Sequence, residues 1–390
     1  MEINKNMDFA KKSLEVHRKI RGKIEIKPKV KVNTAIDLAL AYTPGVAAPC
    51  SAIAKNKNES FNLTARGNLV AVITDGSAVL GLGNIGPEAG MPVMEGKCVL
   101  FKAFANVDAI PLCLNTQKVD EIVNIVKALE PSFGGVNLED IGSPRCFEVE
   151  KRLKEELSIP VMHDDQHGTA IVVAAALTNA IKVVNKRKGN LRIVINGPGA
   201  AGIAIGNLLL TMNFGNVLMV DRVGILNHKS RTLPPHHVEI AKISNKYNEN
   251  GDLKAALTNA DVFIGVSAGN VVSLEMAKLM NKNAIIFAMA NPIPEILPDV
   301  AKRAGAKIIG TGRSDFPNQI NNALVFPGMF RGALDAKAKQ ITDKMKIAAV
   351  NAIASLIKPS ELKPNYVIPS VLDKRVVPAI AKAVARATHK

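Results

Sequence analysis

Two pairs of adjacent carboxylates stand out as residues that could do chemistry. Glu139 and Asp140 form the first pair, and Asp164 and Asp165 form the second; each follows a short apolar run typical of a buried strand. Because ligands of parallel α/β sheets bind at the carboxyl ends of the strands, both pairs can converge on one crevice. Three carboxylates with positions left open for water and substrate suit Mg²⁺ or Mn²⁺. Taken singly, each pair would be a helix N-cap or a solvated turn.

Two histidines flank the second pair, at a spacing that resembles a zinc site. His163 and His167 are four residues apart, which would place them on one face of a helix. Gly168 interrupts the run at an expected strand-to-helix junction, and no third soft ligand is near in the sequence. We therefore expect hydrogen-bonded loop histidines rather than zinc ligands.

A glycine-rich turn indicates a dinucleotide site. It lies between an apolar run expected to be a strand and a stretch expected to be a helix, followed by a second strand and an acid. The first glycine permits a tight turn, the second lets backbone N–H groups approach a pyrophosphate, and the third allows close helix packing. The residues expected to contact the cofactor here are Gly197, Pro198, Gly199, Ala200, Ala201 and Gly202.

The acid at the end of the second strand bears on cofactor choice. Asp221 would accept hydrogen bonds from the ribose hydroxyls and repel a 2′-phosphate, which favours NAD. Arg222 follows immediately and could pair with that phosphate. We expect NAD to be preferred, with NADP usable at lower efficiency.

The elements that must position these residues alternate as in a parallel α/β protein. A helical N-terminal stretch to about residue 21 is followed by an exposed extended segment and a loop. Strands are expected at 69–74, 98–101, 110–114, 135–138, 159–162, 192–196, 217–220, 262–266, 284–289 and 307–309, and helices at 118–129, 146–157, 169–184, 201–211, 333–355 and 376–387. The predicted fold is α/β, with an N-terminal substrate and metal domain (1–167) and a doubly wound Rossmann-type dinucleotide domain with C-terminal helices (168–390).

Composition excludes several classes of protein. The 390 residues are 47% hydrophobic and 22% charged, as in ordinary globular proteins, and no apolar stretch is long enough to span a bilayer. The N-terminus does not resemble a secretory signal, so we expect a cytoplasmic protein with no membrane partner. Four isolated cysteines are expected to be buried thiols. The net charge of +16 is spread along the chain without a recognised module, so no specific nucleic-acid partner is expected.

Seven segments, in order, resemble the malic enzymes of the short bacterial type along nearly the whole chain. They are AYTPGVAAPC, TDGSAVLGLGNIGPEAGMPVMEGKCVLFKAF, NLEDIGSPRCFEVEKRL, HDDQHGTAIVV, INGPGAAGIAIGNLL, ANPIPEI and GRSDFPNQINNALVFPGMFRGALD. The resemblance implies oxidative decarboxylation of (S)-malate to pyruvate and CO₂ with NAD or NADP and a divalent cation. It also suggests a homodimer, and it leaves open whether Tyr42 serves its own or its partner's site.

The resemblance also assigns roles to residues of this chain. Tyr42 matches the acid that protonates C3, and Lys97, expected just before a strand, matches the general base. Glu139, Asp140 and Asp165 match the metal ligands, and Asp164 matches an acid beside the lysine. Two amides are assigned to the ligands: Asn291 to cofactor and substrate, and Asn322 to substrate, which Lys97 also contacts.

One segment departs from the larger malic enzymes, which carry an arginine in a TDG-x-R segment that grips a substrate carboxylate. This chain has Ala78 at that position. The clamp is expected from elsewhere, with the backbone N–H groups of residues 81–86 as candidates.

Two rival functions remain open from the residues alone. A metal-independent amino-acid dehydrogenase also joins a substrate domain to a dinucleotide domain and uses a lysine. A non-catalytic polyanion-binding protein on a dehydrogenase fold would show salt-sensitive nucleic-acid binding and no turnover. Metal dependence of the reaction separates both from a malic enzyme.

Overall fold

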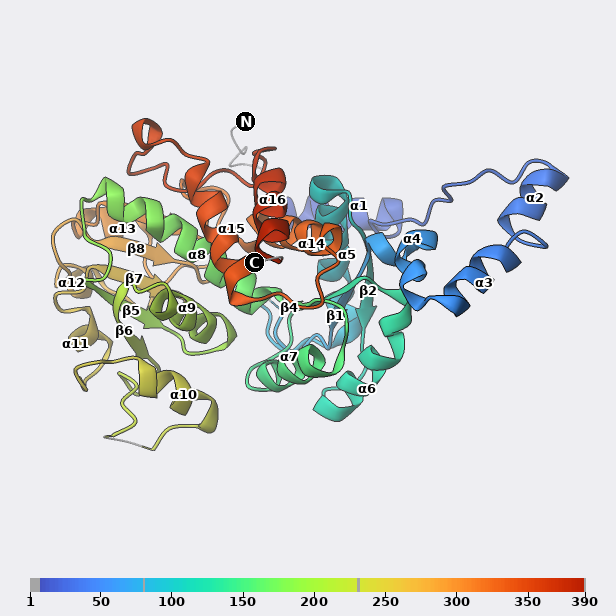
Figure 1. Ribbon diagram of the computed structural model, residues 1–390. Coiled ribbons are helices and arrows are strands. Elements are labelled where there is room, and N and C mark those ends of the chain that lie inside the picture. The colour runs from blue at the N-terminus through green and yellow to red at the C-terminus, as the bar shows by residue number, and fades with distance from the viewer. Residues whose placement is uncertain (1–7, 80, 230–231, 389–390) are drawn as a thin grey trace.

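Two parallel sheets, joined by one long central helix, form the body of the molecule (Figure 1). The computed structural model describes residues 8–79, 81–229 and 232–388. The residues of the predicted N-terminal helix before position 8 lie outside this part. In the described residues, no helix combines the length and the apolar character that a membrane crossing needs.

The first sheet has four parallel strands in the order β2-β1-β3-β4. The central strands β1 and β3 are almost wholly buried, as expected where helices cover both faces. The chain crosses over between β1 and β3, so the crevice of this sheet opens where those two strands end. The strands are β1 (Leu69–Thr74), β2 (Asp108–Cys113), β3 (Gly135–Leu138) and β4 (Val161–His163), and the helices are α5 (Pro87–Ala105), α6 (Val119–Leu129) and α7 (Arg145–Glu156).

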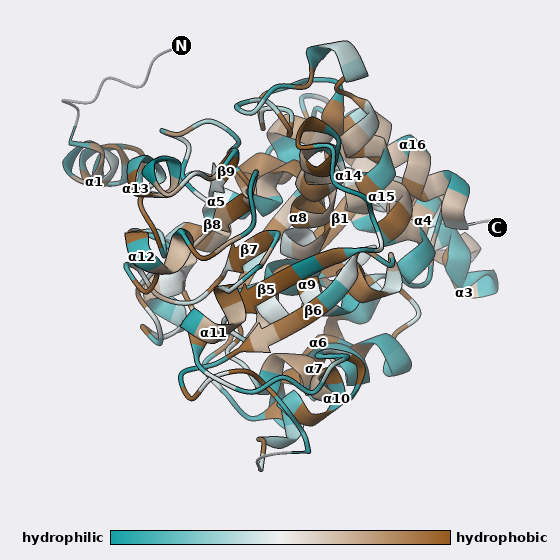
Figure 2. Ribbon diagram, turned by 90° about the vertical axis from the view of Figure 1, so that its left-hand side faces the viewer, coloured by the Kyte–Doolittle hydropathy of each residue, from teal (hydrophilic) through white to brown (hydrophobic). Residues whose placement is uncertain are grey.

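The second sheet has five parallel strands in the order β6-β5-β7-β8-β9, a doubly wound arrangement. Its strands are strongly apolar, as Figure 2 shows by their brown colour. The strand order reverses between β5 and β7, which is where such sheets bind nucleotides. The strands are β5 (Leu191–Asn196), β6 (Gly215–Val220), β7 (Val262–Gly265), β8 (Ile285–Ala288) and β9 (Ile308–Thr311), and the helices are α9 (Ala200–Thr211), α10 (Pro235–Ile243), α11 (Leu253–Leu257), α12 (Leu274–Ala277) and α13 (Pro298–Arg303).

One continuous hydrophobic core runs through both sheets because α8 (Asp164–Val183) belongs to both. Its run of alanines and valines is buried, since helices and strands cover it on all sides. Three C-terminal helices complete this core: α14 (Phe326–Asp335), α15 (Asp343–Ser355) and α16 (Val376–Thr388). Short 3₁₀ helices lie at Lys57–Glu59, Ala65–Asn68, Glu130–Ser132, Asn322–Leu324 and Pro359–Glu361.

The N-terminal segment first runs along the body, where Lys23 N donates to Glu95 of α5, and then projects as an arm (Figure 1, blue). It contains α1 (Phe9–Ile20), α2 (Ala35–Ala41) and α3 (Ala47–Lys55), and the chain joins the body through α4 (Ser60–Leu63). No residue of α1, α2 or α3 is buried.

Three predictions about local structure are wrong. The apolar run 98–101 is not a strand but part of α5, because a short apolar run does not distinguish a buried strand from a buried helix. The expected helix 333–355 is interrupted after Asp335 and resumes at Asp343. Of the four free cysteines, Cys98 and Cys146 are buried, whereas Cys113 is partly buried and Cys50 is exposed.

Candidate active site

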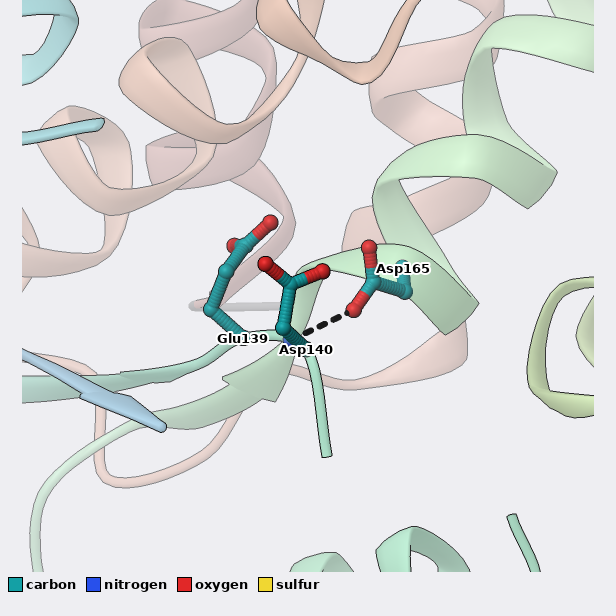
Figure 3. Close-up of side chains that lie close together, drawn as sticks. All are labelled: Glu139, Asp140 and Asp165. Atoms are coloured by element: carbon teal, nitrogen blue, oxygen red, sulfur yellow. Dashed lines mark hydrogen bonds between the residues drawn. The ribbon is translucent and has the colours of Figure 1, made fainter. Parts of the chain in front are cut away.

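Three carboxylates meet where β3 ends and α8 begins (Figure 3). Glu139 and Asp140 follow β3 directly, and Asp165 lies in the first turn of α8. One oxygen from each lies within 4.8 Å of the others. The backbone N–H of Asp140 donates to Asp165 Oδ2 at 2.8 Å, which fixes the two segments together. The sequence prediction that the two acidic pairs converge is therefore confirmed.

The loop after β1 braces the turn that carries Asp140. Asp140 has a positive φ of 53°, and its carbonyl accepts from Ala78 N at 3.0 Å. Ser77 Oγ accepts from Gly142 N at 2.8 Å and donates to the buried Asp75. The loop that lacks the clamp arginine therefore supports the carboxylate turn.

Lys97 lies between the two acidic pairs. Its ammonium donates to Asp164 and lies 3.0 Å from Glu139 Oε1, and its side chain is only 10% exposed. Nζ also lies 4.3 Å from the centre of the Phe326 ring, a favourable cation–π distance. The expectation that Lys97 precedes a strand is wrong, because α5 carries the residue into the interior. Burial therefore sets Lys97 apart from the exposed Lys102 on the same helix.

The charges of this cluster perturb one another strongly. Burial by itself would lower the pKa of Lys97, but the attraction of Asp164, Glu139 and Asp165 outweighs it and raises this pKa. Burial, together with repulsion from Asp165, raises the pKa of Asp140 to about 8. Burial likewise raises the pKa of Glu139, against the opposing effect of Lys97. If Glu139, Asp140, Asp164 and Asp165 were all ionised, the cluster would hold more negative charge than its one cation balances.

A divalent cation fits these residues. Asp140 Oδ2 is buried and has no hydrogen-bond partner among the described residues, although carboxylate oxygens in protein interiors are normally paired. Glu139, Asp140 and Asp165 offer only oxygen ligands, which Mg²⁺ and Mn²⁺ prefer. Positive charge held here would relieve the repulsion among the three carboxylates.

A glycine in the first turns of α8 makes room for Asp164. A Cβ added at Gly168 would lie 1.9 Å from Asp164 Oδ1 and 3.1 Å from the Cβ of Asn322. Gly168 thus lets Asp164 fold back toward Lys97, and it brings Asn322 beside the lysine–carboxylate pair. Asn322 is one of the residues assigned to substrate, and the structure places it at this site.

The buried Glu150 of α7 anchors the start of α8 from behind. Its carboxylate accepts from the backbone N–H of His163 at 3.0 Å and from Lys154 Nζ at 2.7 Å, and it lies 2.9 Å from His167 Nε2. His167 is thus a hydrogen-bonded histidine as predicted, but it lies in α8 rather than in a loop. His163 does not fit the prediction, because both its ring nitrogens are buried without a hydrogen-bond partner among the described residues, although Nδ1 lies 3.8 Å from Asp165 Oδ2.

The glycine-rich turn adopts the predicted strand–turn–helix geometry between β5 and α9. Gly197 has a φ of +106°, and a Cβ there would lie 2.6 Å from the carbonyl oxygen of Val266. A Cβ at Gly202 would lie 1.9 Å from the carbonyl oxygen of Gly197, so α9 packs closely on the turn. A Cβ at Gly199 would meet nothing within 4 Å, which leaves the helix N-terminus open to a ligand.

A cavity of about 1030 Å³ extends from this turn to the end of β6. Asp221 lies at its edge, and its Oδ1 accepts from the N–H groups of Val223 and Gly224 at 2.8 and 3.0 Å. Arg222 is exposed at the same edge. The lining also includes Ser143, three residues after Asp140, so the cavity reaches toward the carboxylate cluster.

A buried acid links the loops at the ends of β7 and β8. Glu295 is fully buried and accepts from Ser267 N at 2.8 Å and from Ala290 N at 3.0 Å. Ser267 in turn accepts from Asn196 Nδ2, next to the glycine-rich turn. Asn291 follows Ala290 directly, so Glu295 holds the loop that carries Asn291 against the dinucleotide side of the crevice.

Two sequence-based expectations fit the structure less well. Tyr42 ends α2 in the arm, where 68% of it is exposed, and the chain does not bring it to the carboxylates. In the glycine loop proposed as a substrate clamp, the N–H groups of Leu82 and Gly83 donate to Val79, and those of 85 and 86 donate to Gly76. Within 81–86, only positions 81 and 84 have N–H groups without a backbone acceptor among the described residues.

Sequence reasoning missed several residues that shape the site. Three of them act through contacts between segments that are separated in the sequence: Phe326 under Lys97, Glu150 behind α8, and Glu295. Asn137 instead donates to Glu139, two residues along the chain. Gly168 alone had a local signal, since a glycine within the first turns of a helix requires a packing reason.

The comparisons with known proteins agree with this geometry. The family model for the malic enzyme N-terminal domain matches residues 21–154, and that for the malic enzyme NAD-binding domain matches residues 166–389. A bifunctional malic/malolactic enzyme of Bacillus subtilis is 56% identical over 98% of this chain and 93% of its own length. An NAD-dependent malic enzyme of Geobacillus stearothermophilus is 52% identical over 95% of this chain and 77% of its own.

Solved structures give the same result. The crystal structure of an NAD-dependent malic enzyme from Thermotoga maritima superposes with a TM-score of 0.92 at 50% identity, covering 96% of this chain and 98% of that chain. The predicted fold class is therefore confirmed, whereas the domain boundary at residue 167 stays a prediction. With both domain models matched in order and the buried lysine–carboxylate cluster between them, the chain belongs to the malic enzyme family.

Proposed function

We propose that this protein catalyses the oxidative decarboxylation of (S)-malate to pyruvate and CO₂, with reduction of NAD and, less efficiently, of NADP. The observation that carries the proposal is the position of Lys97, buried between Glu139 and Asp164 beside a three-carboxylate cluster. The cavity at the dinucleotide turn extends toward this cluster as far as Ser143. A metal-independent amino-acid dehydrogenase has no need of such a cluster.

Different residues of the site would act in different steps of the reaction. A Mg²⁺ or Mn²⁺ ion bound by Glu139, Asp140 and Asp165 would supply positive charge against the negative charge that develops on substrate oxygen. Lys97 would accept the proton of the C2 hydroxyl as hydride passes to nicotinamide C4, and Asp164 would hold the lysine in place. After CO₂ leaves, Tyr42 would return a proton to C3 of enolpyruvate.

The electrostatics of the cluster bear on the basicity of Lys97. In the described residues the carboxylates favour the ammonium form of Lys97, which cannot act as a base. Positive charge on the three carboxylates would oppose that effect, and the burial of Lys97 would then favour the neutral amine. The amides of Asn291 and Asn322 would orient the substrate at the same crevice.

The protein would work as a cytoplasmic homodimer on this small-molecule substrate. The many exposed apolar side chains of the arm support a partner subunit. The proposal requires no nucleic-acid partner and no membrane partner.

An absorbance assay of NADH formation tests the function. We expect malate-dependent reduction of NAD that requires Mn²⁺ or Mg²⁺ and yields pyruvate. Turnover of an amino acid, or malate turnover that persists after complete removal of divalent cations, would contradict the proposal.

A further inference from the structure

A second cavity lies at the edge of the second sheet that is opposite the dinucleotide turn. It has a volume of about 840 Å³, within the range of small-molecule sites, and it is lined mainly by residues 189–192, 215–216 and 242–248. Here β5 and β6 begin and α10 ends, so we call it the amino-end cavity. The dinucleotide cavity lies where the same two strands end, and within the described chain the two cavities share no lining residue. The amino-end cavity is therefore a separate site that the proposed malate chemistry does not use.

Three buried polar atoms of residues that line the amino-end cavity have no hydrogen-bond partner among the described residues. They are Arg192 Nε, Asn216 Nδ2 and Ser244 Oγ. The two nitrogens can only donate, whereas the hydroxyl can donate or accept. Ser244 is only 5% exposed, and polar groups buried to this extent are normally hydrogen-bonded. Three unpaired groups around one cavity indicate a ligand that is rich in acceptor atoms.

Other hydrogen bonds fix the segments that carry these three groups. The guanidinium of Arg192 donates through Nη1 to Glu249, and Asn216 Oδ1 accepts from the backbone N–H of Lys246 at 2.9 Å. Asn245 Oδ1 accepts from the backbone N–H of Glu249 at 2.8 Å, which closes the loop after α10. The unpaired donors are therefore held in position before a ligand binds, which lowers the entropic cost of binding.

The lining of the amino-end cavity is basic. It includes Arg192, Lys229, Lys242 and Lys246, and no Asp or Glu is among its described residues. Lys242 has a structural explanation, because it lies in the last turn of α10, where the helix dipole favours a cation, and pairs with Glu239 at 2.8 Å. The helix dipole does not explain the buried donors. Together, the donors and the cations favour an anionic ligand.

The chemistry of the lining selects oxyanions. Phosphoryl and carboxylate groups accept several hydrogen bonds at once, and such charge-assisted bonds are stronger than bonds between neutral groups. A small polyanion would give an acceptor to each unpaired donor and would balance the positive charge of the lining.

We propose that the amino-end cavity binds a small polyanionic metabolite through its phosphoryl or carboxylate oxygens. Arg192 Nε, Asn216 Nδ2 and Ser244 Oγ donate to the anion, and the exposed Lys246 adds positive charge at the rim. The cavity is separate from the dinucleotide turn and from the carboxylate cluster. Binding there consequently does not depend on the proposed malate activity.

Isothermal titration calorimetry of the metal-free protein with two probes tests the site. Pyrophosphate represents phosphoryl ligands, and citrate represents carboxylate ligands. We expect saturable binding of at least one probe, and the probe that binds more tightly identifies the group that the cavity prefers. The absence of saturable binding by both probes would overturn the proposal.

Two variants that introduce the same residue locate the binding. Asn216→Asp keeps the oxygen that accepts from Lys246 N, but it replaces the unpaired donor with a negatively charged oxygen, so the affinity for the probe should fall at least about tenfold. Gly199→Asp is the matched control at the dinucleotide turn, where a Cβ meets nothing within 4 Å and Asp is a favoured helix N-cap. This control should bind the probe like the wild type. A loss of binding in Gly199→Asp but not in Asn216→Asp would assign the anion to the dinucleotide turn and overturn the proposal.

Ser244→Ala separates a role in ligand binding from a role in folding. The hydroxyl of Ser244 is buried without a hydrogen-bond partner among the described residues, so its removal should leave the thermal midpoint of the ligand-free protein unchanged or slightly raised. The same change should weaken binding of the probe severalfold, because one donor to the anion is lost. A lower thermal midpoint together with unchanged affinity would overturn the role of Ser244 as an anion ligand.

Discussion

Burial determines what Lys97 can do. Most lysines of this basic chain are exposed, where an ammonium is fully hydrated and chemically inert. Lys97 instead lies among Asp164, Glu139 and the ring of Phe326, so its protonation depends on the charge held nearby. A lysine whose basicity depends on the positive charge held by nearby carboxylates suits a reaction that begins with loss of a hydroxyl proton.

Partial reactions separate the base from the acid. Reduction of oxaloacetate requires no protonation at C3, so Tyr42→Phe should lose pyruvate formation far more than oxaloacetate reduction. Lys97→Ala should damage both reactions, because Lys97 handles the proton of the C2 oxygen in each. Equal losses in both reactions for both variants would refute the separate roles.

Gly168 offers a second test at the scale of one residue. Gly168→Ala places a methyl group 1.9 Å from the present position of Asp164 Oδ1, so Asp164 must move away from Lys97. We expect malate turnover to fall about tenfold or more, and the thermal midpoint to fall as well, because the helix propensity of alanine only partly offsets a close contact in a buried site. The neighbouring Thr169→Ala is the control and should keep wild-type turnover. Unchanged turnover in Gly168→Ala would show that the placement of Asp164 is not critical.

At the scale of elements, α8 has two roles, one in the site and one in the core. Its first turn carries Asp164 and Asp165, and the helix dipole favours negative charge at that end. The same helix then runs as a buried apolar rod through the core of both sheets. Asp164 and Asp165 are therefore held by a long helix that is buried along most of its length.

The turn after β6 carries the prediction about cofactor choice. Two backbone N–H groups hold Asp221 Oδ1, whereas Arg222 is exposed and free to change its rotamer. We expect wild-type kcat/KM to be higher with NAD than with NADP. Asp221→Ala should narrow or invert this preference, and Arg222→Ala should mainly weaken NADP. A wild-type preference for NADP that is unchanged in Asp221→Ala would place the selectivity elsewhere.

The same elements show how far the sequence alone could lead. The strands β1 and β3 were predicted with their observed bounds, and β5 and the glycine turn nearly so, because each joins an apolar run to a specific turn signal. The run 98–101 was misassigned because its apolar residues lie within a helix that is buried on one face. Lys97 is buried because it lies in that helix, so the sequence did not predict its burial either.

The candidate site was predictable to a similar degree. Strand-end acids converge in any parallel sheet, so the meeting of Glu139, Asp140 and Asp165 could be expected from the sequence. The contacts of Phe326 and Glu150 depend on packing between distant segments, which local patterns do not report. The placement of Tyr42 depends on the path of an arm whose sequence shows only helical and extended stretches.

At the scale of the whole molecule, the two sheets share one hydrophobic core, so a change in the packing of one sheet affects the other. The carboxylate cluster lies where β3 of the first sheet meets the start of α8, and α8 continues into the second sheet. Repulsion among the three acids acts at this junction. A reduction of that repulsion should therefore raise the free energy of unfolding of the whole protein.

The last prediction is that Mn²⁺ stabilises the folded protein through this junction. A ligand that binds only the folded state adds about 2.7 kcal/mol to the free energy of unfolding at 100 times its Kd. Mn²⁺ should therefore raise the thermal midpoint, and a chelator should reverse the rise. Asp165→Asn removes a charged oxygen ligand, so the variant should fold and bind dinucleotide but lose both the Mn²⁺-dependent rise and malate turnover. Glu239→Gln, at an exposed carboxylate away from the cluster, should respond to Mn²⁺ like the wild type. An equal rise in the wild type and in Asp165→Asn would mean that the ion binds elsewhere, because the cluster cannot hold it as tightly with one acid neutralised.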